Sequence, residues 1–413
     1  MTNASSMAVG PIDPTTFDPN APTFIADPYP TFAWFRDHLP TASLSLVPGK
    51  VPPSTWVFSN TDVRRVLEET ETFLKRAGGP GAPPAAPVPP VFGTIGALPP
   101  GLLSSDPPRH AQVRGAVEPS FTAAIADAGA LAEHAVEQTL AGLSNTRRIE
   151  LVHDFALPVP SMVLAQVLGL PVTDLTILSN WVQAVATSHN ITQPSAMLGL
   201  GATCAMALRT YYDGLIVENS HQSGGGMLGG VCAHVDQGLD RRDVQSIMSD
   251  MLIAGFLTTT YLISTGIRTL LAHPEQADAV RQDPVLLGAA IEEMLRFDAP
   301  AQLLDRQVAV PTVLGGVALQ PGARVVAAVG SANRDPVAFA DPDRFDIHRT
   351  ETTHLGFGDG IHHCIGAPLA RIVAPAAIAG LLSLPELRIN GIEQWQPDPY
   401  LRGFTSLPMA YGA

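Results

Sequence analysis

The spacing of apolar positions along this chain is helical over most of its length and strand-like only in short stretches. TFAWFRDHL at 31–39 has the pattern of a first helix, and STWVFS at 54–59 has that of a strand. Residues 60–73 predict a second helix, capped by Asn60 or Thr61. Residues 106–300 are mostly helical in pattern, whereas short β-like runs separated by glycine turns occur in 306–345. The chain is therefore predicted to be mainly α with small β-sheets, an α+β fold.

Two stretches interrupt this pattern. Residues 1–26 are punctuated by prolines and predict an irregular N-terminal arm. Residues 76–100 hold eight prolines and five glycines, which excludes a regular element. Composition alone favours a linker there, and the sharper alternative is a long loop over a binding site, spanning 76–105. No linker divides the helical part, so a single domain over 1–413 is expected.

Composition narrows the class of protein. A formal net charge of −14 argues against a nucleic-acid partner, which needs a basic face. Three scattered cysteines are too few for a disulfide framework and fit a reducing cytoplasm. The N-terminal residues lack the pattern of a signal peptide, and prolines break the longest apolar runs before they reach the roughly 20 residues of a membrane span. A soluble cytoplasmic protein without a membrane partner is expected.

The segment FGDGIHHCIG, residues 357–366, carries the most specific chemistry. A lone cysteine such as Cys364 is a small buried hydrophobe, a nucleophile or a metal ligand. Glycines at 358, 360 and 366 would let the backbone approach a flat group closely, and a helix beginning near Ala367 would place its positive end beside the sulfur. A single thiolate suits neither zinc nor an iron–sulfur cluster, but it suits haem iron.

The same segment resembles the haem-binding loop of the cytochrome P-450 (haem-thiolate monooxygenase) superfamily, F-G-x-G-x-H-x-C-x-G, at every fixed position. The resemblance extends from DPYP at 27–30 to RGFTSLP at 402–408 and is to the soluble bacterial type. It implies a single triangular haem domain in which haem b (iron protoporphyrin IX) has Cys364 as its axial iron ligand. Phe357, Gly358 and Gly366 would contact the cofactor.

Two further stretches match the family's structural and cofactor-binding positions. EEMLR at 292–296 supplies Glu293 and Arg296, which the family buries as a pair joined by a later arginine, here Arg344 of PDRF. Taken alone, such a pair is common on helices. DPPRHAQVR at 106–114 places a histidine and an arginine four apart, either as a solvated stripe or as a grip on the haem propionates. The resemblance implies these propionate contacts: His110, Arg114, Arg306 and His362.

MLIAGFLTT, residues 251–259, matches the middle of the helix that crosses the distal haem face in the family. The small residues Ala254 and Gly255 would let the helix widen or kink where oxygen binds, and Thr258 would lie over the iron. The alternative is a buried helix whose threonine bonds back to its own backbone. One departure stands out, because Leu257 replaces the usual acid. Asp250, two turns earlier, could feed a water chain.

The resemblance implies a monooxygenase that inserts one oxygen atom from O2 into an apolar or aromatic small molecule, by hydroxylation or O-demethylation. Electrons would come from NAD(P)H through a separate ferredoxin reductase and ferredoxin. Two alternatives stay open: an oxidative-coupling or peroxide-using enzyme, because of Leu257, and a non-catalytic haem-binding protein. The expected substrate contacts are Ser188, His189, Asn190, Ile253, Phe256, Leu257, Ala301, Gln302, Leu303, Phe404 and Thr405.

Overall fold

The computed structural model describes residues 10–75, 99–143, 147–188, 195–219, 225–235 and 237–412. Residues 1–9 of the expected arm, most of the proline-rich loop, and His189 and Asn190 lie outside the described residues. The chain forms two compact units. The sheet unit contains the described parts of Met1–Ala85, Ala272–Cys364 and Gln394–Thr405, and the helical unit contains those of Ala86–Leu271, Ile365–Glu393 and Ser406–Ala413.

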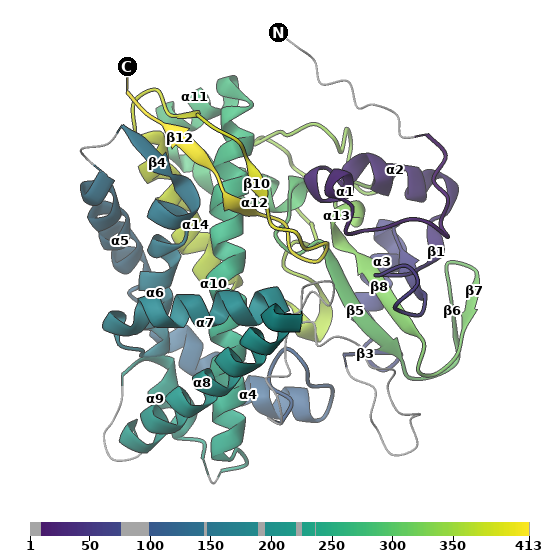
Figure 1. Cartoon of the computed structure of the whole chain (residues 1–413), viewed down its shortest axis with the longest axis horizontal. Helices are drawn as coiled ribbons and strands as arrows, with labels where there is room; N and C mark the ends of the chain where they lie inside the picture. The colour runs from purple at the N-terminus through teal and green to yellow at the C-terminus, as the bar shows by residue number, and fades with distance from the viewer. Residues whose placement is uncertain are drawn as a thin grey trace. The chain divides into compact units, whose positions relative to one another are not determined.

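A five-stranded sheet is the centre of the sheet unit (Figure 1). Its strands follow the order β1 (Thr41–Leu44), β2 (Ser54–Val57), β8 (Arg324–Ala328), β5 (Leu303–Val308) and β3 (Phe73–Leu74). The β2–β8 pair is parallel and sets Trp56 opposite Val326, whereas the other pairs are antiparallel. Branched and aromatic side chains from these strands bury a core with α3. The β-like runs in 306–345 predicted β5 and β8 of this sheet, although β5 begins at Leu303, three residues before the predicted range.

Short helices and hairpins complete the sheet unit. They are α1 (Pro22–Ala26), α2 (Tyr29–His38), α3 (Asn60–Glu68), α11 (Pro274–Gln282), α12 (Leu287–Phe297), α13 (Val329–Ala332), the 3₁₀ turns η3 (Pro284–Leu286) and η4 (Gly360–His362), and strands β6 (Thr312–Leu314), β7 (Val317–Leu319), β10 (Gln394–Trp395) and β11 (Phe404–Ser406). Two sequence predictions need correction. The cap of α3 is Ser59, whose side chain accepts the Asp62 N–H, and the helix ends at Glu68 rather than 73. The arm expected to be irregular contains α1.

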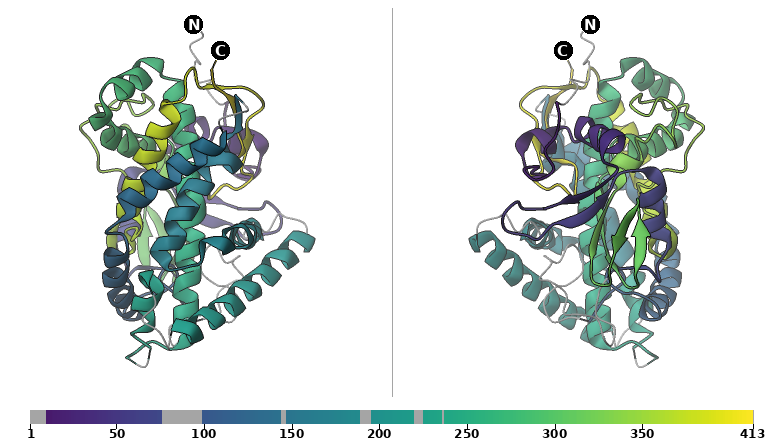
Figure 2. Two further views of the ribbon diagram at one scale, coloured as in Figure 1. Left: turned by 90° about the vertical axis from the view of Figure 1, so that its left-hand side faces the viewer. Right: turned by 90° about the vertical axis from the view of Figure 1, so that its right-hand side faces the viewer.

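The helical unit is built around α10 (Arg241–Leu271), the longest helix among the described residues (Figure 2). Helices α6, α7, α8, α9 and α14 and the π-helical turn η1 pack against α10. The elements of this unit are α4 (Arg109–Ala124), α5 (Ala128–Leu143), β4 (Arg148–Glu150), η1 (Val152–Ala156), α6 (Pro158–Leu168), η2 (Val172–Asp174), α7 (Leu175–Ser188), α8 (Ser195–Asn219), α9 (Gly226–Cys232), α10, α14 (Ala367–Leu382), β9 (Arg388–Ile389) and β12 (Pro408–Ala410).

Helix α10 is long and apolar enough to cross a membrane by length and composition, so the expectation that no segment reaches that length is wrong. Buried residues make up 78% of its most apolar window. A helix that is apolar on all sides and packed against five others is typical of a protein core. Polar residues such as Asp250 and Ser264 lie buried within α10, which is unusual for a membrane span and fits a helix in a protein core.

Candidate active site

The cysteine loop of the sheet unit is a tight, hydrogen-bonded turn. The Cys364 N–H donates to the Phe357 carbonyl at 2.9 Å, and the Gly358 N–H donates to the Leu355 carbonyl at 2.9 Å. Gly358 and Gly360 have φ of +71° and +66°, in the left-handed region that favours glycine. The loop thereby closes on itself and leaves the Cys364 side chain exposed.

Helix α3 supports this loop from one side. A Cβ at Gly360 would lie 2.7 Å from the Leu67 carbonyl oxygen, so only glycine fits the close approach of the two backbones. Arg64 forms an ion pair with Asp359 and donates from Nη2 to the Thr353 carbonyl at 3.0 Å. The sequence did not predict that Arg64 contacts Asp359 and Thr353, because the family motif leaves position 359 unspecified.

Glu293 and Arg296 form the contact that their spacing predicts, and the pair is buried, as the resemblance implies. The Arg296 Nε and Nη2 groups donate to the two Glu293 carboxylate oxygens at 2.7 and 2.8 Å, and the side chains are 1% and 3% exposed. The remaining Arg296 N–H groups donate to three backbone carbonyls, those of Asn333, Pro342 and Arg344. All five guanidinium donors are therefore used, which makes the pair a fixed brace.

The third member of this cluster is Arg349, and the prediction of Arg344 is wrong. Arg349 Nε lies 3.3 Å from Glu293 Oε2, and its side chain is 7% exposed. The Arg344 side chain is 68% exposed and lies 3.5 Å from Asp346, while only its backbone carbonyl joins the cluster. The turn at Asp341, where φ is +43°, belongs to the segment that presents carbonyls to both arginines.

This cluster connects to the cysteine loop through Asn333. Its carbonyl accepts from Arg296, and its Oδ1 accepts the Leu355 N–H at 2.7 Å, two residues before Phe357. His354 adds a second link, with Nε2 at 3.0 Å from Glu292 and Nδ1 accepting the Gly356 N–H at 3.1 Å. Asn333 lies in SANRDP, residues 331–336, a stretch that resembles a turn of the family, whereas no motif marked His354.

The other predicted cofactor contacts of this unit lie on two elements. Arg306 is on β5, is 3% exposed and donates to the Asp305 carbonyl at 2.9 Å. His362 ends the 3₁₀ turn η4 and is half-buried. The centroid of the Phe357 ring lies 6.0 Å from that of His354 and 6.3 Å from that of His363.

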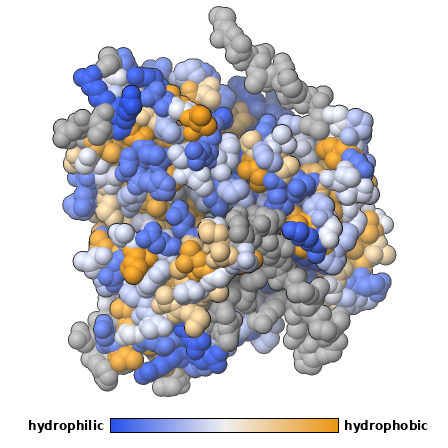
Figure 3. All heavy atoms as spheres, in the orientation of Figure 1, coloured by the Kyte–Doolittle hydropathy of each residue, from blue (hydrophilic) through white to orange (hydrophobic). Residues whose placement is uncertain are grey.

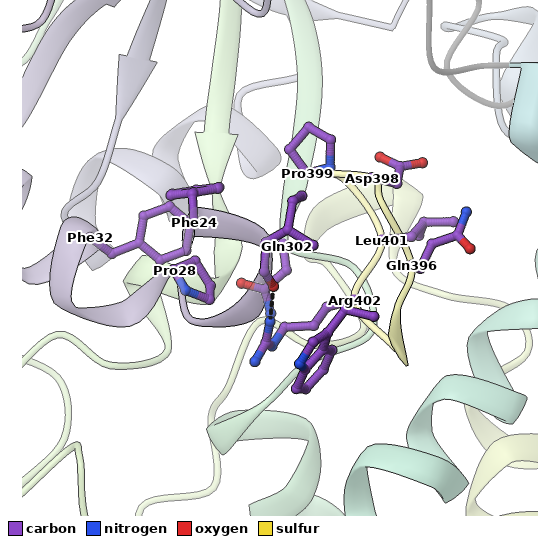
Figure 4. A pocket seen from close by; sticks show the side chains of 11 residues that line it. Phe24, Pro28, Phe32, Gln302, Gln396, Asp398, Pro399, Leu401 and Arg402 are labelled. Atoms are coloured by element: carbon purple, nitrogen blue, oxygen red, sulfur yellow. Dashed lines mark hydrogen bonds between the residues drawn. The ribbon is translucent and has the colours of Figure 1, made fainter. Parts of the chain in front are cut away.

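The predicted substrate contacts in the sheet unit cluster near its C-terminal hairpin. Gln302 is 2% exposed and lines a small hollow, into which Figure 4 shows it pointing together with Arg402. Ala301 bridges to Leu401, and Phe404 is fully buried against Trp395 with ring centroids 4.0 Å apart. The hollow is lined by Phe24, Ile25, Pro28, Phe32, Gln302, Trp395, Gln396, Asp398, Pro399, Leu401 and Arg402.

In the helical unit, α4 carries His110 and Arg114. His110 is 3% exposed, and burial followed by the nearby Arg114 charge lowers its pKa, so its neutral form is favoured. Arg114 lies 3.3 Å from Glu118. The first turn of α4 is tied to the start of α10, because Arg109 pairs with Asp243 and Gln112 donates to the Gly238 carbonyl at 2.6 Å.

The central part of helix α10 has one partly exposed patch, which we call the window. From 243 to 267, every residue is buried except four small ones: Ala254, Gly255, Thr258 and Thr259. Their spacing places them on one face. The Thr258 hydroxyl donates to the Ala254 carbonyl at 2.7 Å, and α10 stays α-helical throughout, so the expected widening is absent. Gly255 instead provides room for α6, because a Cβ there would lie 2.9 Å from the Leu164 Cδ2.

The neighbours of this window are apolar and packed. Ile253, Phe256 and Leu257 are 4%, 1% and 3% exposed. Asp250 accepts the Leu103 N–H at 3.0 Å and is 4% exposed, so its carboxylate holds the chain segment that enters α4. This contact gives Asp250 a structural role that the water-chain hypothesis did not include.

Comparison with known proteins identifies the family. The cytochrome P450 family model matches residues 231–408. The chain is 32% identical over 403 residues to the cytochrome P450 monooxygenase PikC of Streptomyces venezuelae, covering 94% of this chain and 92% of that protein.

Two solved structures share the fold. The crystal structure of CalO2 has a TM-score of 0.85 at 28% identity, covering 96% of this chain and 99% of that one. The cytochrome P450 BioI, in complex with a hexadec-9Z-enoic acid-ligated acyl carrier protein, has a TM-score of 0.84 at 27% identity, covering 94% and 100%. The chain therefore belongs to the cytochrome P450 family, has its α+β fold and is an oxidoreductase of the monooxygenase class.

Proposed function

We propose that this protein inserts one oxygen atom from O2 into an apolar or aromatic small molecule, by hydroxylation or O-demethylation. The family uses a haem-iron cofactor, and our proposal is haem b held through Cys364. The observation that carries it is the cysteine loop, which two glycines, α3 and the Glu293 cluster hold rigid around one exposed thiol. We propose that the whole chain, 1–413, works as one haem domain.

The donor set fits such a cofactor. A single exposed thiol on a glycine loop, that of Cys364, would hold the iron of such a cofactor. The propionates need cations or hydrogen-bond donors, which Arg306, His362, His110 and Arg114 would supply. Of these, Arg306 and His110 are almost fully buried, as expected of groups that meet a carboxylate away from solvent.

When bound, the haem iron supplies oxygen activation, and the protein supplies position and protons. Thr258, in the only unburied stretch of α10 between 243 and 267, would hold a hydrogen bond at the oxygen site with its hydroxyl, which already has Ala254 as a partner. Ala254 would keep that site open because its side chain is small, whereas Gly255 leaves room for α6. Ile253 and Phe256 would contribute apolar surface that excludes water and favours an apolar substrate.

We propose that the electrons reach this protein from a separate one. We propose NAD(P)H as their source, through a ferredoxin reductase and a ferredoxin in the cytoplasm. The face in Figure 3 shows hydrophobic residues in separate spots among hydrophilic ones, which is compatible with a transient, polar contact.

Leu257 favours a second candidate function. Its buried, apolar side chain cannot transfer a proton where the family has an acid. Peroxide brings its own protons and electrons, so a peroxide-using enzyme needs less from this position, and so does an oxidative-coupling enzyme whose oxidant is peroxide. A non-catalytic haem protein is the third and most distant candidate.

A carbon-monoxide spectrum tests the proposed function. The reduced, haem-loaded protein should give a Soret band strongly red-shifted from that of histidine-ligated haem, and Cys364→His should lose it. Cys232→Ser is the matched control, since Cys232 is the other cysteine that is not fully buried. A histidine-like spectrum in the unmodified protein contradicts the proposal. Product formed with O2 and ferredoxin, compared with product formed from peroxide alone, separates the two catalytic candidates.

A further inference from the structure

The chain segment 298–305 of the sheet unit is fastened to residues 400–402 by two polar clamps and a backbone ladder. The ladder consists of the Arg402 N–H donating to the Pro300 carbonyl and the Gln302 N–H donating to the Tyr400 carbonyl, both at 2.8 Å. It surrounds the bridge between Ala301 and Leu401. Backbone ladders this short are weak alone, so the side-chain clamps at both ends decide how rigid the segment is.

The first clamp is centred on Arg402. Its Nε donates to Asp298 Oδ1 at 2.5 Å, and its two Nη groups donate to the Ile25 and Ala26 carbonyls at 2.7 and 3.1 Å. Tyr29 also donates to Asp298 at 2.5 Å. Burial, followed by the Asp298 charge, raises the pKa of Tyr29, so its hydroxyl keeps the proton that it donates.

Arg402 also links the clamp to Phe404. Its guanidinium carbon lies 3.9 Å from the centroid of the Trp395 ring, which packs against Phe404. Arg402 is 8% exposed and Asp298 is 8% exposed. A buried charge pair that is hydrogen-bonded on all sides fixes geometry more than it adds stability.

The second clamp lies at the other end of the segment. Arg324 binds Asp305 through two parallel hydrogen bonds of 3.0 and 2.9 Å, and both residues bond to the Tyr400 hydroxyl. Bidentate pairs of this kind are the most specific in geometry. Because Tyr400 and Arg402 are two residues apart, the two clamps hold one short C-terminal stretch against the whole of 298–305.

We propose that Arg402 and Asp298 are positioning residues that set substrate specificity. They hold the predicted substrate contacts Ala301, Gln302 and Leu303 and, through Trp395, Phe404 in one fixed arrangement. Neither residue needs to touch the substrate. The inference rests on the proposed function, because it takes those four residues as part of the substrate-binding surface.

Azole ligands of two sizes test this in the haem-loaded protein. Imidazole reports access to the haem iron alone, whereas 4-phenylimidazole also reports the surrounding surface, and both are titrated by their Soret shift. In Arg402→Gln and in Asp298→Asn, the Kd for 4-phenylimidazole should rise about tenfold, as expected when a preorganised surface becomes mobile. The Kd for imidazole should change by less than about twofold, within ordinary variation between mutants.

Arg388→Gln is the matched control. Arg388 also donates to two backbone carbonyls, those of Glu386 and Gly412, but on an exposed site of the helical unit. It should change neither Kd. The double variant Arg402→Gln with Asp298→Asn should match the single ones, because both changes open the same clamp.

Three results would overturn the inference: equal weakening of both azoles, no weakening of 4-phenylimidazole, or additive effects in the double variant. If Arg402→Gln does not fold, Tyr29→Phe removes a single donor to Asp298 and should still raise the 4-phenylimidazole Kd alone. A wild-type protein that shows no azole Soret shift would refute the proposed function, and this inference with it. The other negative results refute the inference alone.

Discussion

Arg349 Nε lies 3.3 Å from the Glu293 carboxylate, which places a second buried arginine on the acid that Arg296 already grips. Glu293 also accepts the Asp346 N–H at 2.9 Å. Its carboxylate thus joins α12 to the segment that leads into the cysteine loop. A substitution of Arg349 should therefore loosen both α12 and that segment.

Arg349→Ala and Arg344→Ala should therefore differ strongly. Removing one partner of a buried charge cluster costs roughly 3–5 kcal/mol. Arg344→Ala removes an exposed side chain and should stay within about 0.5 kcal/mol. The free energy of unfolding of the two variants is measured in urea. Equal losses of stability would mean that the Arg344 side chain also belongs to the cluster.

The two left-handed glycines of the loop give a second comparison. Gly358→Ala should lose about 1–2 kcal/mol from backbone strain alone, because the nearest atom to its Cβ is 3.7 Å away. Gly360→Ala adds a contact of 2.7 Å with the Leu67 carbonyl, which cannot move without α3. It should destabilise further and release haem faster, as measured by transfer of haem to an acceptor protein. Similar release rates in both variants would mean that α3 does not support the loop.

Asp398 gives a prediction on pH. Burial raises the pKa of this half-buried carboxyl to about 6, against the pull of the Tyr400 and Leu401 N–H groups. The folded state then binds the proton more tightly than the unfolded state, so stability falls as pH rises from about 4 through 6. Asp398→Asn should raise stability at pH 7.5 by about 1–2 kcal/mol, with the gain shrinking toward pH 4.5.

Urea unfolding at several pH values measures this gain. Asp127→Asn, a change at an exposed carboxyl, is the control and should show no such trend. A gain for Asp398→Asn that is the same at every pH would contradict a raised pKa.

The Thr258 hydroxyl gives a prediction on coupling that depends on the proposed function. Thr258→Val keeps the side-chain shape and removes the hydroxyl, whereas Thr258→Ser keeps the hydroxyl. Product formed per NAD(P)H consumed should fall several-fold in the valine variant, within the range for losing one positioned proton-transfer group. It should change little in the serine variant, and Leu257→Glu should raise oxygen activation. Full coupling in Thr258→Val would remove Thr258 from the mechanism.

The sequence was enough to predict features that depend on local spacing. Glu293 and Arg296 are one helical turn apart, so their contact follows from helix geometry. The cysteine loop is specified within ten residues. Arg349 could not be chosen over Arg344 in the same way, because the choice depends on the path of the chain through 341–349, including the positive φ of Asp341.

The contrast between local spacing and the path of the chain also explains two other features that the sequence did not predict. Ser59 caps α3 instead of its neighbours because its hydroxyl reaches the Asp62 N–H, and sequence places a cap only to within a residue or two. The partners of Arg402 are 104 and about 377 residues away, a separation at which no local pattern gives a signal. Long-range polar clamps therefore required the structure.

The parallel pairing of β2 with β8 joins Trp56 to Val326 across most of the chain, and each unit also closes with residues beyond 393. On the ribosome, strand β2 must wait for some 270 further residues before its parallel neighbour β8 is made. Contacts of such separation fold slowly and leave an edge open meanwhile. Newly made chains should depend on chaperones until synthesis ends, with expression at lower temperature giving more folded protein.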